Sequence, residues 1–162
     1  MKRHFAVAAL IAAPTALFAQ SQLDRLEALS EQMNELMMVK MVEEMVAETG
    51  ADPAPVMELI PDMSWDAEFR AAGECMIDAY RDKIGRGGVD EMLTAMEEAM
   101  PRIETMSMEE MGDELDFMPD GITVSETITI QQDCGMMEVA MERMSSSGFM
   151  EAMFAAAAAA EE

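Results

Sequence analysis

Apolar residues recur at steps of three and four along most of this chain, and that spacing places them on one face of an α-helix. Residues 21–48 show the pattern most clearly and predict one long helix. Its inner face is expected to hold Leu26, Leu29, Met33, Leu36, Met37, Met41 and Met45. Methionine stands at many positions where a helical core usually has leucine, since 22 of the 162 residues are methionine. The spacing therefore predicts an all-α fold with a methionine-rich core.

Residues that begin or end helices divide the chain into segments. Ser21 followed by Asp24 is typical of a capping box at the start of the first helix, and Gly50 is expected to end that helix. Ser64 is expected to begin a second long helix over residues 65–84, which ends at Gly85, Gly87 and Gly88. Further helices are expected over residues 56–60, 90–100, 103–115 and 149–160. Together they predict an irregular bundle of about five or six helices.

Residues 122–130 fit two structures. Their apolar residues share one parity, as in a β-strand, and these are Ile122, Val124, Ile128 and Ile130. A strand needs a partner for its backbone groups, and the chain has no second run of this kind. We therefore expect a helix from near residue 123 or 125 to about residue 144. Its inner face would hold Ile130, Cys134, Met137, Met141 and Met144. A strand that pairs with a second copy of the chain is the alternative.

The first residues have the pattern of a secretory signal peptide. Lys2 and Arg3 precede an uncharged, mostly apolar run over residues 5–19, which ends in a small residue, Ala19. Pro14 interrupts this run, which is shorter than the about 20 apolar residues that span a bilayer. We expect cleavage after residue 19, export to the periplasm and no membrane span. Residues 20–162 would then form a single helical domain, with an alanine-rich terminal helix over residues 148–162 that frays.

The charge and the histidine content exclude several classes of function. Removal of Lys2 and Arg3 with the signal peptide would change the formal net charge from −23 to −25. Such a charge repels nucleic acid and favours basic partners or divalent cations. The only histidine, His4, lies in the expected signal peptide, so the mature chain would have no catalytic or metal-binding histidine. We therefore expect a protein that is not an enzyme.

Cys75 and Cys134 are the only cysteines. A pair of cysteines in an exported domain is typical of a disulfide bond. Both residues fall on the expected inner faces of long helices, so the bond would join the second helix to the late one. A redox pair is the alternative, but redox pairs usually lie close together in sequence, as in C-x-x-C.

The methionine clusters have two interpretations. Thioethers are soft ligands that suit Cu(I), and Met106, Met108 and Met111 fit a buried helical stripe least well. These three are therefore the candidate Cu(I) ligands. Packing is the favoured interpretation, because steps of three and four are also what a buried stripe needs. On that interpretation the chain needs no cofactor.

These observations predict an exported binding or structural module without catalytic activity. The alternative is a methionine-rich periplasmic protein that binds Cu(I) or scavenges oxidants. The residues name no ligand or partner, and they do not determine the oligomeric state.

Overall fold

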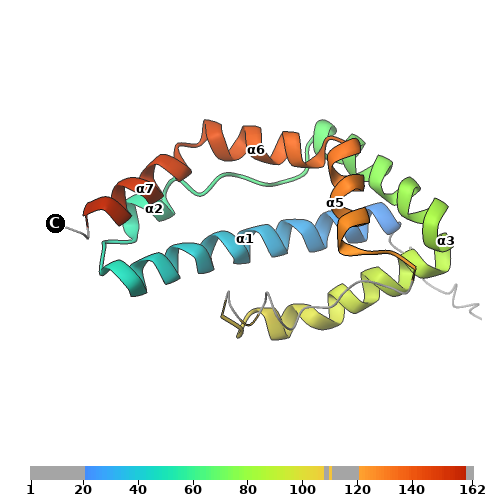
Figure 1. Ribbon diagram of the computed structural model, residues 1–162, viewed down its shortest axis with the longest axis horizontal. Coiled ribbons are helices and arrows are strands. Elements are labelled where there is room, and N and C mark those ends of the chain that lie inside the picture. The colour runs from blue at the N-terminus through green and yellow to red at the C-terminus, as the bar shows by residue number, and fades with distance from the viewer. Residues whose placement is uncertain (1–20, 108–109, 111–120, 160–162) are drawn as a thin grey trace, which may run out of the picture.

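The computed structural model of the chain describes residues 21–107, 110 and 121–159. These residues include six helices and no strand. The helices are α1 (Gln22–Thr49), α2 (Ala54–Met57), α3 (Ala67–Ile103), α5 (Val124–Asp133), α6 (Met136–Ser146) and α7 (Phe149–Ala159) (Figure 1). The predicted all-α class and the expected number of helices are confirmed.

The boundaries of α1 are where the local sequence predicts them. The Ser21 hydroxyl accepts a hydrogen bond from the Asp24 N–H at 3.1 Å, and the Asp24 carboxylate accepts one from the Ser21 N–H at 3.3 Å. This reciprocal pair is the predicted capping box. At the other end Gly50 has a φ of 70°, and its N–H donates to the Val46 carbonyl at 2.7 Å. A side chain at Gly50 would be strained in this left-handed conformation, so glycine suits the end of the helix.

The first half of α3 runs antiparallel to the start of α1. The Trp65 N–H, just before α3, donates to the Glu31 carboxylate at 2.7 Å. Sixteen residues later in α3, the Arg81 Nε donates to the Gln22 side-chain oxygen at 2.7 Å. The chain thus moves from the middle of α1 back to its first turn.

The second half of α3 runs parallel to α1, on another side of it. Gly85 lies inside α3 with a φ of 72° and a ψ of 170°, which bends the helix there. Beyond this bend, Arg25 forms an ion pair with Glu97 at 2.7 Å, and the Lys40 ammonium donates to the Glu104 carbonyl at 3.1 Å. The two halves of α3 therefore pack against α1 in opposite directions (Figure 1).

Only some of the boundaries that the sequence predicts for α3 are confirmed. The predicted break occurs at Gly85, but Gly87 and Gly88 are helical, so the chain turns without a loop. Ser64 does not cap α3, which corrects the prediction. Asp66 is the N-cap, because its carboxylate accepts hydrogen bonds from the Glu68 and Phe69 N–H groups at 3.0 and 3.1 Å.

Trp65 is extended and packs back onto α3. Its ring lies so close to Gly73 that a Cβ atom there would be 2.3 Å from it, so only glycine fits. Ser64 therefore lies two residues before the N-cap, in the segment that leads to Trp65.

Two apolar clusters divide the core, and α1 contributes to both. The first cluster joins the first half of α1 to α3 and α5, with Leu29, Phe69, Leu93 and Ile130 among its buried residues. The second joins the last turns of α1 to α2 and α7, and its buried residues are Met38, Val42, Met45, Val56 and Phe149. The methionine-rich packing expected from the sequence is present in both clusters.

Within residues 122–130, α5 begins at Val124, and none of these residues lies in a strand. The Thr123 hydroxyl accepts from the Glu126 N–H at 3.2 Å, and the Glu126 carboxylate accepts from the Thr123 N–H at 2.9 Å. This capping box begins α5, as the favoured interpretation predicts.

The expected helix does not run unbroken to residue 144. It breaks at Gly135, which has a φ of 75°, and α6 begins there. The expected inner face is confirmed at Ile130, Cys134 and Met144, which pack against the clusters. It is wrong at Met137 and Met141, which are 37% and 65% exposed, because the break changes the rotational phase of the helix. Met136, Val139 and Ala140 pack against the first cluster in their place.

The predicted disulfide bond between Cys75 and Cys134 is present, with Cα atoms 5.6 Å apart. It joins α3 to the last residue before the Gly135 break. Contrary to expectation, Cys75 lies on an exposed face of α3. The bond therefore runs from an exposed position of α3 to Cys134, which packs against the first cluster.

The last helix packs more than its composition suggested. Phe149 is fully buried, and Ala152 and Ala156 pack against the second cluster. The sequence predicts a break over residues 145–148, and the structure confirms it only in part: α6 continues through Ser146, and the turn consists of residues 147–148, where Gly148 has a φ of 74°. Residues 160–162 lie outside the described part of the chain. None of the helices in the described part combines the length and the apolar character that crossing a membrane requires.

Replacing both cysteines by serine is expected to lower the free energy of unfolding by about 4 kcal/mol, because a bridge across 59 positions restricts the unfolded chain. Urea denaturation of the oxidised protein and of the Cys75→Ser/Cys134→Ser variant measures this difference. Reduction of the unmodified protein should lower its stability by a similar amount. A loss below about 1 kcal/mol would show that the bond does not stabilise the fold in this way.

Glu126 is expected to make stability fall in acid. The Lys83 ammonium donates to its carboxylate at 2.8 Å, and this contact and the Thr123 cap lower the pKa of Glu126 to about 2. Its folded pKa lies below its unfolded value of about 4.3, so the stabilisation is complete above that value and is lost as the pH falls towards 2. Lys83→Met should raise the pKa of Glu126, as measured by carboxyl-carbon NMR titration. Thr123→Ser keeps the cap and serves as the control. An unchanged titration of Glu126 in Lys83→Met would contradict the assigned cause.

Candidate functional site

Three hollows in the surface share α1 as a wall. The first lies between the middle of α1 and the extended segment 60–64, with a volume of about 330 Å³. The second lies between the end of α1, α2 and α7, with a volume of about 470 Å³. The third lies between α1 and α7 and has a volume of about 320 Å³. We refer to them as the acidic hollow, the alanine hollow and the methionine groove.

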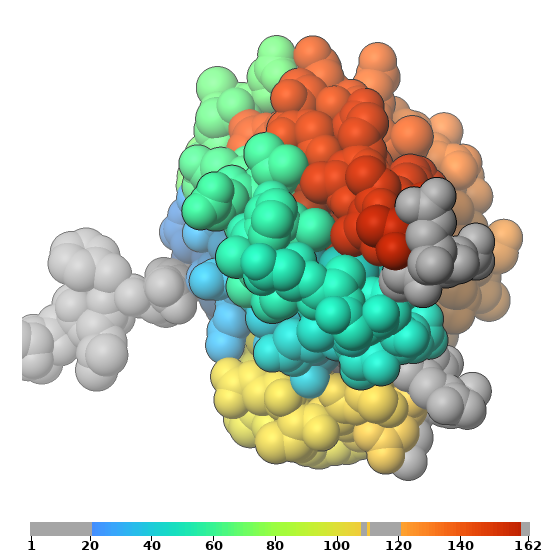
Figure 2. Space-filling view, turned by 90° about the vertical axis from the view of Figure 1, so that its left-hand side faces the viewer, coloured from blue at the N-terminus to red at the C-terminus, as the bar shows by residue number. Residues whose placement is uncertain are grey.

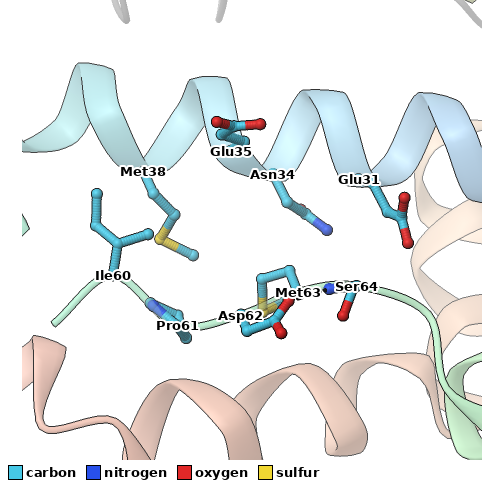
Figure 3. Close-up of a pocket in the computed structure, with 9 residues that line it drawn as sticks. All are labelled: Glu31, Asn34, Glu35, Met38, Ile60, Pro61, Asp62, Met63 and Ser64. Atoms are coloured by element: carbon cyan, nitrogen blue, oxygen red, sulfur yellow. Dashed lines mark hydrogen bonds between the residues drawn. The ribbon is translucent and has the colours of Figure 1, made fainter. Parts of the chain in front are cut away.

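The acidic hollow combines carboxylates with an apolar surface. Its lining residues are Glu31, Asn34, Glu35, Met38, Ile60, Pro61, Asp62, Met63 and Ser64. Figure 3 shows Asn34 and Met38 pointing from α1 towards the 60–64 segment, while the Glu35 carboxylate lies farther from that segment. None of the nine lining residues is lysine or arginine. The hollow therefore offers negative charge beside apolar side chains.

Two carboxylates that line the acidic hollow also fix its shape. The Glu31 carboxylate accepts the Trp65 N–H, which ties the segment to α1. The Asp62 carboxylate accepts the Ser64 N–H at 2.9 Å, and this bond is the main cause that lowers the pKa of Asp62. Asp62 is therefore ionised at neutral pH, and the backbone turn at 62–64 depends on it.

Arg143 of α6 anchors the same segment from the other side. Its guanidinium donates to the carbonyls of Asp62 and Ser64 at 3.1 and 2.6 Å and forms an ion pair with Asp66 at 2.5 Å. It also lies 4.4 Å from the centre of the Phe69 ring, which favours a cation. The segment is thus held between α1 and α6, and the hollow is preformed.

The alanine hollow is mostly apolar. Residues 49–52, Pro55 and Val56 form one side of it. The other side consists of alanines of α7, namely Ala152, Ala155, Ala156 and Ala159. Figure 2 looks onto this end of the molecule, where the red α7 lies beside the turquoise residues of α1 and α2. The small alanine side chains leave the space open.

The methionine groove brings four thioether side chains together from two helices. Met41 and Met45 line it from α1, and Met150 and Met153 line it from α7. Its other lining residues are Glu44, Glu48, Thr49, Phe154 and Ala157. Met45 is 7% exposed, and the other three methionines are partly buried against the second cluster. The groove is therefore a packed surface that also presents sulfur atoms.

Of the three Cu(I) ligands expected from the sequence, the structure describes only Met106. Met106 packs against the first cluster, and its carbonyl accepts a hydrogen bond from the Lys40 ammonium at 2.7 Å. Met108 and Met111 lie outside the described residues, as does most of the helix expected over residues 103–115. Within the described part of the chain, no group of three or more histidine, cysteine, aspartate and glutamate side chains is arranged to hold a metal ion.

The sequence did not identify the residues that form these hollows. From the sequence, segment 60–64 is predicted to end one short helix and to begin the next helix. The sequence does not predict that the segment packs against another helix. Met41 and Met45 were placed on the inner face of the first helix, and Met150 and Met153 were not singled out. Their spacings of four and three residues place each pair on one helix face. That signal could have indicated two methionine faces, but not that the two faces meet.

Comparison of the chain with known proteins gives no assignment: no family model, no curated protein and no solved structure matches it.

Proposed function

We propose that this chain is exported, loses residues 1–19, and works as a binding protein without catalytic activity for small organic cations. The expected ligands are small molecules that carry both an amine and an apolar part. The acidic hollow between α1 and segment 60–64 would be its site. The observation that carries the proposal is the lining of this hollow, where three carboxylates stand beside apolar side chains and no basic residue is present.

The chemistry of the hollow supports a cationic ligand. An ammonium group bound in the hollow would gain Coulomb attraction from Glu31, Glu35 and Asp62, whose carboxylates line it. The apolar part of the ligand would contact Met38, Ile60 and Met63. The formal net charge of −23 would attract cations to the whole surface and speed their encounter with the site.

The size and the support of the hollow favour a small ligand. Its volume of about 330 Å³ lies near the lower end of the range of small-molecule sites. Because Glu31 and Arg143 already hold its outer segment in place, binding would require little ordering of the chain.

Export is supported by the pattern of residues 1–19 and by the disulfide bond, which forms and persists in oxidising compartments. Expression of the whole chain in a bacterium, followed by mass spectrometry of the periplasmic fraction, tests it. The expected mature chain begins at Gln20, or within one or two residues of it. A full-length protein in the cytoplasm would contradict export.

Amine binding is tested by titrating the mature protein with a series of alkylamines and following backbone amide NMR signals. Saturable shifts are expected around residues 31–38 and 60–64. Glu35→Gln is expected to weaken binding about fivefold, since an ion pair with an exposed carboxylate contributes up to about 1 kcal/mol. The matched control is Glu74→Gln, which removes the same charge from an exposed position of α3 outside the hollow.

Comparison of the two variants distinguishes binding at the acidic hollow from general attraction of cations by the negative surface. A loss of affinity in Glu35→Gln alone supports the acidic hollow. Equal losses in both variants, or no saturable shift with any amine, would contradict the proposal.

A further inference from the structure

The methionine groove has the arrangement of a soft-metal site. Met41 and Met45 are four residues apart on α1, so their side chains leave the same face of that helix one turn apart. Met150 and Met153 are three residues apart on α7 and also share a face. Both faces line the same groove, so the four methionine side chains border one volume of about 320 Å³.

A hydrogen bond holds the sulfur of Met45 in place. Its Sδ lies 3.5 Å from the Thr49 hydroxyl, and Thr49 is itself a lining residue. Phe149 lies fully buried in the cluster that these methionines pack against. Packing therefore restricts the thioethers before any ligand arrives, which reduces the entropy that binding must overcome.

The electrostatic surroundings favour a cation. Glu44 and Glu48 line the groove, and neither lysine nor arginine does. The groove also lies at the last turns of α1, where the carbonyl end of the helix carries a partial negative charge. The last turn of α1 contains no basic residue that would offset this charge. These negative groups would thus attract a singly charged metal ion to the groove, where the neutral sulfur atoms would bind it.

Imidazole and thiolate ligands do not compete with the thioethers for a soft metal in the described part of this chain. The only histidine is His4, at the beginning of the chain, and both cysteines are bound in the disulfide. Thioethers suit Cu(I), whereas carboxylates are harder ligands and do not favour Cu(I) over other metal ions. We infer that Met41, Met45, Met150 and Met153 form a Cu(I)-binding site between α1 and α7.

This site is independent of the acidic hollow. The two share no lining residue, so either can fail without the other. It also differs from the set Met106, Met108 and Met111, which the sequence alone favours and which lies on another part of the chain.

Anaerobic titration of the mature, oxidised protein with Cu(I) in competition with bicinchoninate tests the site. No thiol reductant is added, so that the disulfide stays intact. Methionines labelled with ¹³C in their methyl groups report which thioethers respond, and Ag(I) is a redox-inert replacement for Cu(I) in the NMR experiment. One equivalent of Cu(I) is expected to bind, with shifts at the four groove methionines.

The groove variant is Met41→Leu/Met153→Leu, and the matched control is Met137→Leu/Met141→Leu on the exposed face of α6. Leucine keeps the side-chain volume, so both variants are expected to fold, which circular dichroism checks. The groove variant is expected to bind Cu(I) about tenfold or more weakly. Removing a group that only supports a metal ligand already lowers metal affinity by about tenfold, and this variant removes two of the ligands themselves. The control is expected to keep the affinity of the unmodified protein.

Three outcomes would overturn the inference. The first is an affinity for Cu(I) no greater than that of free methionine. The second is an equal loss in the two variants, which would indicate dispersed binding by many methionines. The third is a set of NMR shifts confined to methionines outside the groove, including Met106, Met108 and Met111.

Discussion

The burial of α1 is the constraint on which the rest of the structure depends. Its apolar face contributes to the first cluster through Leu26 and Leu29 and to the second through Val42 and Met45. A helix of 28 residues that is buried along its length needs partners along its length as well. The bend of α3 at Gly85 supplies them for the first half, because it lets one helix pack against α1 in both directions. The second half is covered by α2 and α7.

Surface contacts hold the late helices in place around this helix. The disulfide fixes the end of α5 to α3, and Arg143 of α6 is hydrogen-bonded to the segment that precedes α3. The Lys83–Glu126 ion pair joins α3 to the start of α5. These contacts lie at or near the surface, so the interior is left to methionine and other apolar side chains. Methionine suits such a core because its flexible side chain fills irregular gaps between helices that cross at different angles.

The three hollows are a consequence of this arrangement. The 60–64 segment is extended and thinner than a helix, so it covers the middle of α1 incompletely. The helix α7 carries alanines where it faces α2, and their small side chains leave a second space. Next to it, the longer side chains of Met150 and Met153 reach the methionines of α1. Carboxylates line both the acidic hollow and the methionine groove, so each is expected to bind a positively charged ligand. The amine and Cu(I) proposals have this feature in common.

The sequence alone determined the features that depend on near neighbours in the chain. The capping box at Ser21, the end of α1 at Gly50 and the bend at Gly85 follow from local hydrogen bonds and from the φ angles that glycine allows. The disulfide was predictable because the chain has only two cysteines. The exposed Met137 and Met141 were not predictable, since the Gly135 break changes the phase of α6 by an amount that only packing sets. The meeting of α1 with segment 60–64 and with α7 was also decided by tertiary structure. Helix periodicity shows which face is apolar, but it does not show which other face will cover it.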